Sequence, residues 1–420
     1  MQTHLAPEFQ NTPDGREAEA ILRKCVHCGF CTATCPTYQL LGDELDGPRG
    51  RIYLIKQVLE GAAPTRKTQL HLDRCLTCRN CETTCPSGVQ YGHLVDIGRK
   101  LVDERVPRPA TENAVRWALK EGLPSPLFAP AMKLGQAVRG LLPAALQAKV
   151  PPRQAAGRWP TRSHARKMLM LEGCVQPAMM PNINAATARV LDAAGIQVVL
   201  AAGAGCCGAV KFHLNDQGGG KAEMRRNIDA WWPHVEAGEG IGVEAIVMNA
   251  SGCGVTVKEY GHILQGDPAY AAKAARISEL TKDLSELLPE LVTALKDRLP
   301  RPSGERAGVR GAPKLAFHPP CTLQHGQQLR GGVEKYLGEL GFDIQVASNE
   351  AHLCCGSAGT YSVLHSEIAY ELRDRKLANL AEMAPETIVS ANIGCITHLQ
   401  SGTTTPVRHW VEVLDEALLN

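Results

Sequence analysis

Apolar positions in the first hundred residues recur with the period of an α-helix. Three stretches show this period: residues 16–24, residues 46–61 (with Ile52, Ile55, Val58 and Leu59 on one face) and residues 94–106. The pattern predicts an N-terminal part built from helices.

The second half of the chain repeats itself. Five segments of one copy match five of the other in the same order: 167–177 with 314–324, 188–199 with 334–345, 204–210 with 352–361, 244–254 with 386–396, and 277–288 with 407–418. Each copy alternates short apolar runs with amphipathic stretches, which predicts a parallel α/β sheet in each. The last pair of segments is predicted to form equivalent closing helices.

A basic, proline-rich stretch separates the two halves. Between residues 122 and 167 there are seven prolines, eight lysines or arginines and no acidic residue. Residues 131–150 are predicted to form a basic amphipathic helix interrupted by Pro143. This stretch is either a plain solvated linker, a docking site for a partner subunit, or a contact for anionic lipid headgroups.

We therefore expect a multidomain α and α/β protein with four parts. These are a helical domain at 1–106, a linker at 107–166, and two α/β domains at 167–300 and 312–420.

Composition excludes several classes of protein. A net charge of +2 and an aromatic content of 5% disfavour binding to nucleic acid. No apolar run reaches the roughly 18 residues of a membrane-spanning helix, and the N-terminus lacks the pattern of a secretory signal. Sixteen cysteines without such a signal favour metal chemistry in the cytoplasm over a disulfide framework.

Eight of the cysteines form two copies of the pattern C-x2-C-x2-C-x3-C-P. In bacterial two-cluster ferredoxins, the first three cysteines of a copy bind one [4Fe–4S] cluster and the fourth binds the other. The expected ligand sets are Cys25, Cys28, Cys31 and Cys85 for the first cluster, and Cys35, Cys75, Cys78 and Cys81 for the second. Zinc sites and disulfides fit less well, because zinc sites usually combine two widely separated C-x2-C pairs.

The other eight cysteines recur in register in the repeat. The first copy carries Cys174, Cys206, Cys207 and Cys253, and the second carries Cys321, Cys354, Cys355 and Cys395. All are expected at the carboxyl ends of strands, where α/β proteins bind ligands. A buried structural thiol explains one cysteine but not two matched sets of four, so we expect a metal or cluster site in each copy.

These motifs together resemble a known family over essentially the whole chain. The repeat resembles the cysteine-rich CCG domain of heterodisulfide reductase, succinate:quinone reductase, anaerobic glycerol-3-phosphate dehydrogenase and glycolate or lactate dehydrogenase subunits. The long gap between Cys35 and Cys75 resembles the helical ferredoxin domain of respiratory dehydrogenases. The chain is most similar to the iron–sulfur subunits of bacterial glycolate oxidase (glycolate dehydrogenase), on residues 21–61, 71–92, 170–177 and 227–233.

This resemblance implies an electron-transfer subunit that performs no substrate catalysis itself. A partner subunit with FAD would oxidise glycolate to glyoxylate, with D-lactate as a second substrate, and the electrons would pass to quinone or another carrier. The complex would lie in the cytoplasm, on the inner face of the cell membrane. The alternatives are a subunit of a lactate or anaerobic glycerol-3-phosphate dehydrogenase, and a heterodisulfide-reductase-like subunit with catalysis at the CCG cysteines.

The chain departs from the heterodisulfide reductase pattern at one position in each copy. There the last cysteine belongs to a C-x-x-C pair, whereas Ala250 and Asn392 stand at the first position here. A five-thiolate cluster is therefore not favoured. An ordinary cluster, zinc, or a redox dithiol at the Cys-Cys pairs stays open for the four thiols of each copy.

A few charged and polar residues lie beside the cysteines. His27, His318 and His325 could tune a cluster through hydrogen bonds, or could be solvated or core histidines. Arg49 and Arg51 could offset thiolate charge, or could cap local carbonyls.

Overall fold

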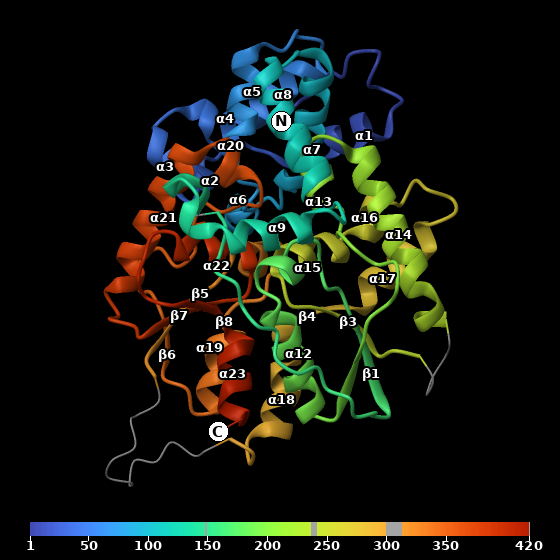
Figure 1. Ribbon diagram of the computed structural model, residues 1–420. Helices are drawn as coiled ribbons and strands as arrows, with labels where there is room; N and C mark the ends of the chain where they lie inside the picture. The colour runs from blue at the N-terminus through green and yellow to red at the C-terminus, as the bar shows by residue number, and fades with distance from the viewer. Residues whose placement is uncertain (148, 237–241, 300–312, 420) are drawn as a thin grey trace.

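Eight short strands form two four-stranded sheets in the part of the chain that the computed structural model describes, residues 1–147, 149–236, 242–299 and 313–419 (Figure 1). The first sheet has the order β2-β1-β3-β4, with β1 Arg166–Met170, β2 Ile196–Val199, β3 Ala245–Met248 and β4 Thr281–Asp283. The second has the order β6-β5-β7-β8, with β5 Leu315–His318, β6 Ile344–Val346, β7 Thr387–Ser390 and β8 Val407–His409.

All neighbouring strands in both sheets run parallel. Of the four central strands, β3 and β5 are buried along their whole length and β1 and β7 along most of it, as expected for parallel sheets covered by helices on both faces. The predicted fold class, a helical part followed by two repeated parallel α/β units, is confirmed. We call the described residues of 166–299 the first α/β unit and those of 313–419 the second; the expected boundary at 300–312 lies outside the described residues.

Helices and the loops between them make up residues 1–106, which we call the helical layer. Its helices are α1 Pro13–Lys24, α2 Phe30–Ala33, α3 Pro36–Leu41, α4 Pro48–Leu59, α5 Arg66–Asp73, α6 Asn80–Thr84 and α7 Tyr91–Arg105, with a short 3₁₀ turn, η1, at Glu44–Asp46. The three predicted helical stretches correspond to α1, α4 and α7. Their apolar faces meet in one core that includes the fully buried Leu22, Ile55 and Leu94.

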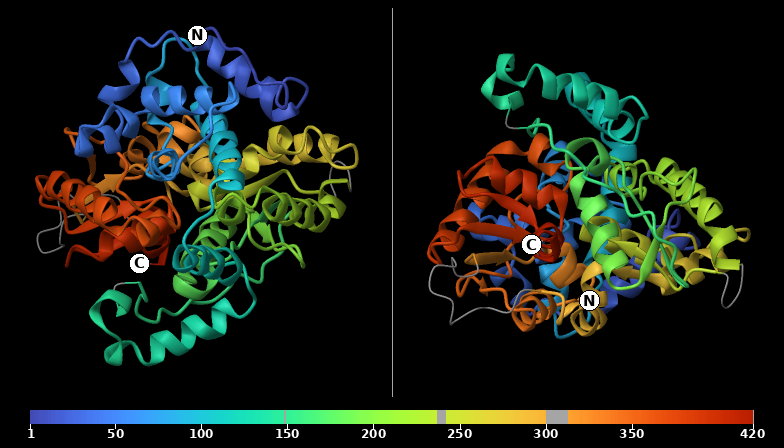
Figure 2. Two further views of the ribbon diagram at one scale, coloured as in Figure 1. Left: turned by 90° about the horizontal axis from the view of Figure 1, so that it is seen from above. Right: turned by 60° about the horizontal axis from the view of Figure 1, so that its bottom comes forward.

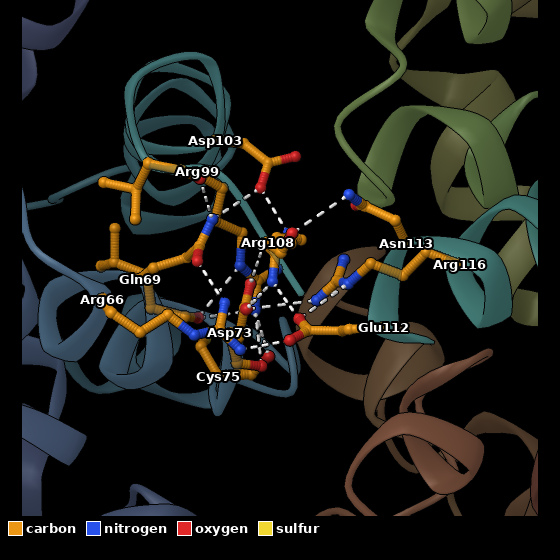
Figure 3. A network of polar contacts seen from close by, with 12 residues as sticks. Arg66, Gln69, Asp73, Cys75, Arg99, Asp103, Arg108, Glu112, Asn113 and Arg116 are labelled. Atoms are coloured by element: carbon orange, nitrogen blue, oxygen red, sulfur yellow. Dashed lines mark hydrogen bonds and ion pairs between the residues drawn. The ribbon is translucent and has the colours of Figure 1, made fainter. Parts of the chain in front are cut away.

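Helix α8, Ala110–Gly122, extends the helical layer into the expected linker. Just before it, Arg108 donates to the carboxylate of Asp73 at 2.6 Å, and Arg116 within it lies 3.2 Å from the same carboxylate. Burial opposes ionisation of Asp73, but the two arginines outweigh it and keep the pKa of Asp73 below its usual value. This network, shown in Figure 3, anchors α8 to α5 and α7.

The helix predicted over residues 131–150 is wrong in its extent. The structure has α9 Phe128–Ala137, the 3₁₀ turn η2 Arg139–Leu141 and α10 Ala144–Gln147. Leu142 is extended, with ψ of 145°, because the ring of Pro143 disfavours the helical conformation for the residue before it. Figure 2 shows these pieces, in teal, standing away from the body of the protein. No helix among the described residues is long and apolar enough to cross a bilayer.

The predicted closing helices are also wrong in register. Residues 277–288 contain the end of α17 Ala271–Leu280, strand β4 and the turn η3 Leu284–Leu287, and the closing helix is α18 Leu288–Leu295. In the second unit, β8 leads directly into α23 Trp410–Leu419. The equivalent features are therefore a strand and a following helix. Strands of three residues carry too little periodicity to be told from a helix end.

The two α/β units share one hydrophobic core. Helix α12 (Asn182–Ala193) of the first unit packs against α23 of the second, and α18 packs against α19 (Gly332–Glu339). Arg189 of α12 donates to Asp415 of α23 at 2.6 Å. A single core cluster includes Leu191 and Leu291 from the first unit and Leu337 and Leu414 from the second. The two units are thus packed as one body (Figure 1).

A cluster of charged side chains joins the helical layer to the first unit. The rings of His93 in α7 and His262 in α16 (Tyr260–Ile263) stack with centroids 4.0 Å apart. Glu17 of α1 lies 3.4 Å from His93 and 3.0 Å from His262, and Glu259 lies 3.3 Å from His93. Burial lowers the pKa of His93, but the hydrogen bonds with Glu17 and Glu259 outweigh it and raise the pKa to about 9.

This cluster predicts a pH-dependent contribution to stability. Because the pKa of His93 is raised from 6.5 to about 9, its stabilisation is complete below about pH 6.5 and is lost as the pH rises through 9. We expect His93→Gln to lower the free energy of unfolding by on the order of 2 kcal/mol near pH 6 and by little near pH 10. Urea unfolding at both pH values measures this, with the exposed His4→Gln as control. An equal loss at both pH values would contradict the assignment.

Candidate metal centres

The two ferredoxin-like motifs adopt the same backbone path. In the first, His27 and Gly29 have positive φ values of 56° and 87°, and in the second the matching Thr77 and Arg79 have 53° and 59°. Non-glycine residues rarely adopt this conformation, and it persists where the surrounding structure imposes it, often at functional sites. These turns bring the first three cysteines of each motif around a common cavity.

The eight cysteines line two neighbouring cavities. The first is lined by Cys25, Cys28, Cys31 and Cys85, together with Cys81. The second is lined by Cys35, Cys75, Cys78 and Cys81. Cys81 and Tyr91 line both, so the two cavities adjoin. Each cavity thus contains one of the two ligand sets expected from the spacing.

The charges around these cavities fit a cationic metal group. Burial, and then the neighbouring Cys25, raises the pKa of Cys31 to about 11. Burial also raises the pKa of Cys78 and Cys81 well above the usual value. Thiolates in such a place need positive charge, which bound iron would supply. Arg51 lines the second cavity and is buried; its Nη2 forms no hydrogen bond among the described residues but lies 3.5 Å from the carboxylate of Asp46.

Other side chains hold the motifs in place. Arg99 of α7 donates to the carbonyl oxygens of Leu72 and Cys75 at 2.8 and 2.5 Å, which fixes the start of the second motif (Figure 3). Arg49, by contrast, is paired with Glu44 at 2.6 Å. Sequence reasoning singled out Arg49 and Arg51 but missed Arg99 and Tyr91, because helical spacing alone does not tell which α7 side chains face the cavity.

In the second α/β unit the four cysteines meet at the carboxyl edge of the sheet. Cys321 follows β5, Cys354 and Cys355 precede α20 (Tyr361–Leu364), and Cys395 lies in the first turn of α22 (Ile393–Gln400). The Sγ atoms of Cys321 and Cys354 are 3.7 Å apart. The side chains of Cys355, Cys395 and His318 place one ligand atom each within 4.8 Å of one another. The structure therefore brings this predicted set together.

The first α/β unit repeats the arrangement. Cys174 follows β1, Cys206 and Cys207 precede α13 (Ala209–His213), and Cys253 lies in the first turn of α15 (Ser251–Lys258). Hydrogen bonds from the thiols of Cys174 and Cys207 lower the pKa of Cys206. The Cys206 thiol raises the pKa of both neighbours in turn. Cys206 therefore ionises more easily than its two neighbours, and further thiolates in this set would need a bound cation.

The second cavity of the helical layer adjoins the second α/β unit. Leu76 and Cys78 belong to one small apolar cluster with Cys321, Cys354 and Tyr361. The Tyr361 hydroxyl donates to the carbonyl oxygen of Arg74 at 3.0 Å. His325 of the π-helical turn η4 (Thr322–Gly326) lies 3.0 Å from Thr83 of α6, so it belongs to this contact and not to solvent. No signal in the sequence could have indicated this adjacency.

Comparisons with known proteins agree with these features. A 4Fe-4S dicluster domain model matches residues 21–89, and a cysteine-rich domain model, CCG, matches residues 168–258 and 315–400. The glycolate oxidase iron-sulfur subunit of Escherichia coli (strain K12) is 56% identical over 421 residues, which cover 100% of this chain and 99% of that protein.

More distant relatives share all or part of the chain. The probable glycolate oxidase iron-sulfur subunit of Bacillus subtilis (strain 168) is 29% identical over 94% of this chain and 92% of its own length. Lactate utilization protein A of Bacillus licheniformis is 26% identical over 59% of this chain and 99% of its own length. With the full-length similarity to the Escherichia coli protein, the chain belongs to the family of glycolate oxidase iron-sulfur subunits, components of an oxidoreductase complex.

Proposed function

We propose that this chain carries electrons from a partner subunit with FAD toward quinone. The partner oxidises glycolate, and D-lactate as a second substrate, to the corresponding oxo acids. The proposal is supported by the names of the relatives, which are subunits of a glycolate oxidase, and by a lactate utilization protein among them. [4Fe–4S] clusters, when bound, supply one-electron carriers whose potentials depend on nearby hydrogen bonds and charges.

The observation that carries the proposal is the pair of adjoining cysteine-lined cavities in the helical layer. One cluster would be held by Cys25, Cys28, Cys31 and Cys85, and the other by Cys35, Cys75, Cys78 and Cys81. Pro48, Cys81 and Tyr91 line both cavities, so the two sites would be close neighbours.

The cysteines of the two α/β units would hold a further cluster or zinc in each unit. Because Cys78 packs with Cys321 and Cys354, the second unit adjoins the second cavity of the helical layer. Electrons that enter at the first cavity would therefore pass through the second cavity to the second unit. The positions of the three sites in the fold set this order. The apolar cluster between the second cavity and the second unit would exclude water from the path.

We expect Cys75→Ser to stop electron transfer without stopping substrate oxidation. In the assembled complex, glycolate should still reduce the flavin in a single turnover, while glycolate-dependent reduction of a dye or quinone falls to background. Iron analysis should give about eight irons per chain for the helical layer alone, with more if the α/β units hold clusters. Val115→Ser, a change at an exposed position of α8 that lines neither cavity, serves as control and should keep full activity. Unchanged dye reduction by Cys75→Ser would refute this role.

We further propose that α9 and η2 hold the complex on the inner face of the cell membrane. Leu127, Leu134 and Leu141 are 74%, 67% and 87% exposed on these pieces. Lys133 and Arg139 lie among them; Nε of Arg139 donates to the carbonyl oxygen of Val150 at 2.8 Å, which keeps the guanidinium within this segment. Residues 122–167 contain no acidic side chain. Exposed apolar side chains interspersed with cations suit the surface of an anionic bilayer. Lys149 is not part of this surface, since it donates to the carbonyl oxygen of Ser362 at 3.2 Å.

Sedimentation with anionic lipid vesicles tests this surface. Each cation near such a surface contributes about 1 kcal/mol, so Lys133→Gln with Arg139→Gln should weaken binding by about tenfold or more. Lys24→Gln with Lys67→Gln, exposed cations of the helical layer, should leave binding unchanged. If the Lys133 and Arg139 changes abolish copurification of the partner subunit but not vesicle binding, the surface contacts protein and the membrane assignment is wrong.

A further inference from the structure

The two α/β units carry the same four cysteines but differ in what surrounds them. His318 is the last residue of β5, three residues before Cys321, and is 1% exposed. At the same distance before Cys174 the first unit has Leu171, which is 3% exposed. An apolar side chain in one copy thus corresponds to a buried imidazole in the other.

The imidazole of His318 makes no hydrogen bond among the described residues, at either Nδ1 or Nε2. A buried polar group without a hydrogen-bond partner destabilises the folded state. The apolar Leu171 causes no such destabilisation in the first unit. The nearby buried His398, by comparison, has its Nε2 3.0 Å from the carbonyl oxygen of Ala369.

The same imidazole does approach the cysteine site. One of its nitrogens lies within 4.8 Å of the Sγ atoms of both Cys355 and Cys395. Imidazole nitrogen and thiolate sulfur together form common ligand sets for zinc and, in some proteins, for iron–sulfur clusters. A bound metal group would give the imidazole the partner that the protein itself does not provide.

We propose that His318 is a nitrogen ligand of the metal group in the second α/β unit, and that the first unit binds its group through thiolates alone. This inference rests on the proposed function, in which both units hold a metal group.

Two other differences between the units also place groups that stabilise negative charge on sulfur beside the second site. Asn392 donates to Cys395 Sγ at 3.6 Å, whereas Ala250 stands at this place before Cys253. Lys376, buried at 2% exposure, lies close enough to Cys355 and Cys354 to interact with their charges. The corresponding position of α14 (Gln217–Glu236) is the neutral Asn227, which donates to the carbonyl oxygen of Cys206 at 2.7 Å.

The correspondence between Lys376 and Asn227 follows from the packing of the Cys-Cys-Gly turns. Gly208 faces the carbonyl oxygen of Gly220 in α14, and Gly356 faces that of Ala369 in α21 (Ser366–Ala381). Lys376 and Asn227 each lie seven residues further along their helix. A neutral ligand, a hydrogen-bond donor to sulfur and a cation all favour the reduced state of a cluster. The second unit is therefore the site that accepts electrons more readily.

Pulsed EPR of the reduced full chain, labelled with ¹⁵N-histidine, tests the ligand directly. The wild type should show a strongly coupled histidine nitrogen at a centre outside the helical layer, and His318→Leu should lose it completely. His318→Cys replaces one ligand with another, so it should retain iron while losing the nitrogen coupling and shifting the reduction potential downward. His409→Asn, another buried histidine of this unit, is the control and should keep the coupling.

Metal analysis of the same samples tests the proposed metal sites of the α/β units separately from the proposed His318 ligand. If the wild type holds about eight irons and no zinc, the α/β units bind no metal, and both the proposed metal sites and this ligand are wrong. If the units hold zinc, X-ray absorption at the zinc edge replaces EPR and should show one site with nitrogen that His318→Leu removes. If metal is present but the wild type and His318→Leu give the same nitrogen signal, the proposed metal sites stand and His318 is not a ligand.

Discussion

Buried sulfur is the constraint on which this structure depends. Thiols that are excluded from water and crowded together ionise only with difficulty, as the raised pKa values of Cys31, Cys78 and Cys81 illustrate. Buried cations such as Arg51 and Lys376 compensate part of the thiolate charge, and cysteine-lined cavities leave room for a metal group. The helical layer and the sheet edges are both arranged to bring four sulfurs to one point.

The packing of the two α/β units against each other determines where their four-cysteine sites lie. Since α12 packs on α23 and α18 on α19, the two sheets are fixed relative to each other by a common core. The helical layer contacts both units, through His93 and Glu17 at the first and through Asn80 and Tyr361 at the second. Among the described residues, only the second contact brings cysteines of the two parts into one cluster.

The motifs and the fold class could be predicted because they depend on local spacing. Cysteine spacing predicted the sets that line the two cavities, and the repeat predicted two parallel sheets. The three-residue strands β4 and β8 could not be told from helix ends, and the end of α9 at Ala137 depends on turns that the helical period does not encode. The contact between Cys78 and Cys354 joins residues far apart in the chain, so it depends on tertiary packing that no local pattern carries.

The shared core also limits how this architecture can change through evolution. A unit that gave up its partner would expose the apolar faces of two helices, so neither half of the duplication is free to be lost or transferred as a module. The cysteine edges of the two units also meet, since the amide of Ser251 donates to the carbonyl oxygen of Ala391 at 3.1 Å and α15 packs against η4. Duplication has thus produced a pair that is inherited whole, in which single residues at each edge, such as Leu171 and His318, can still differ.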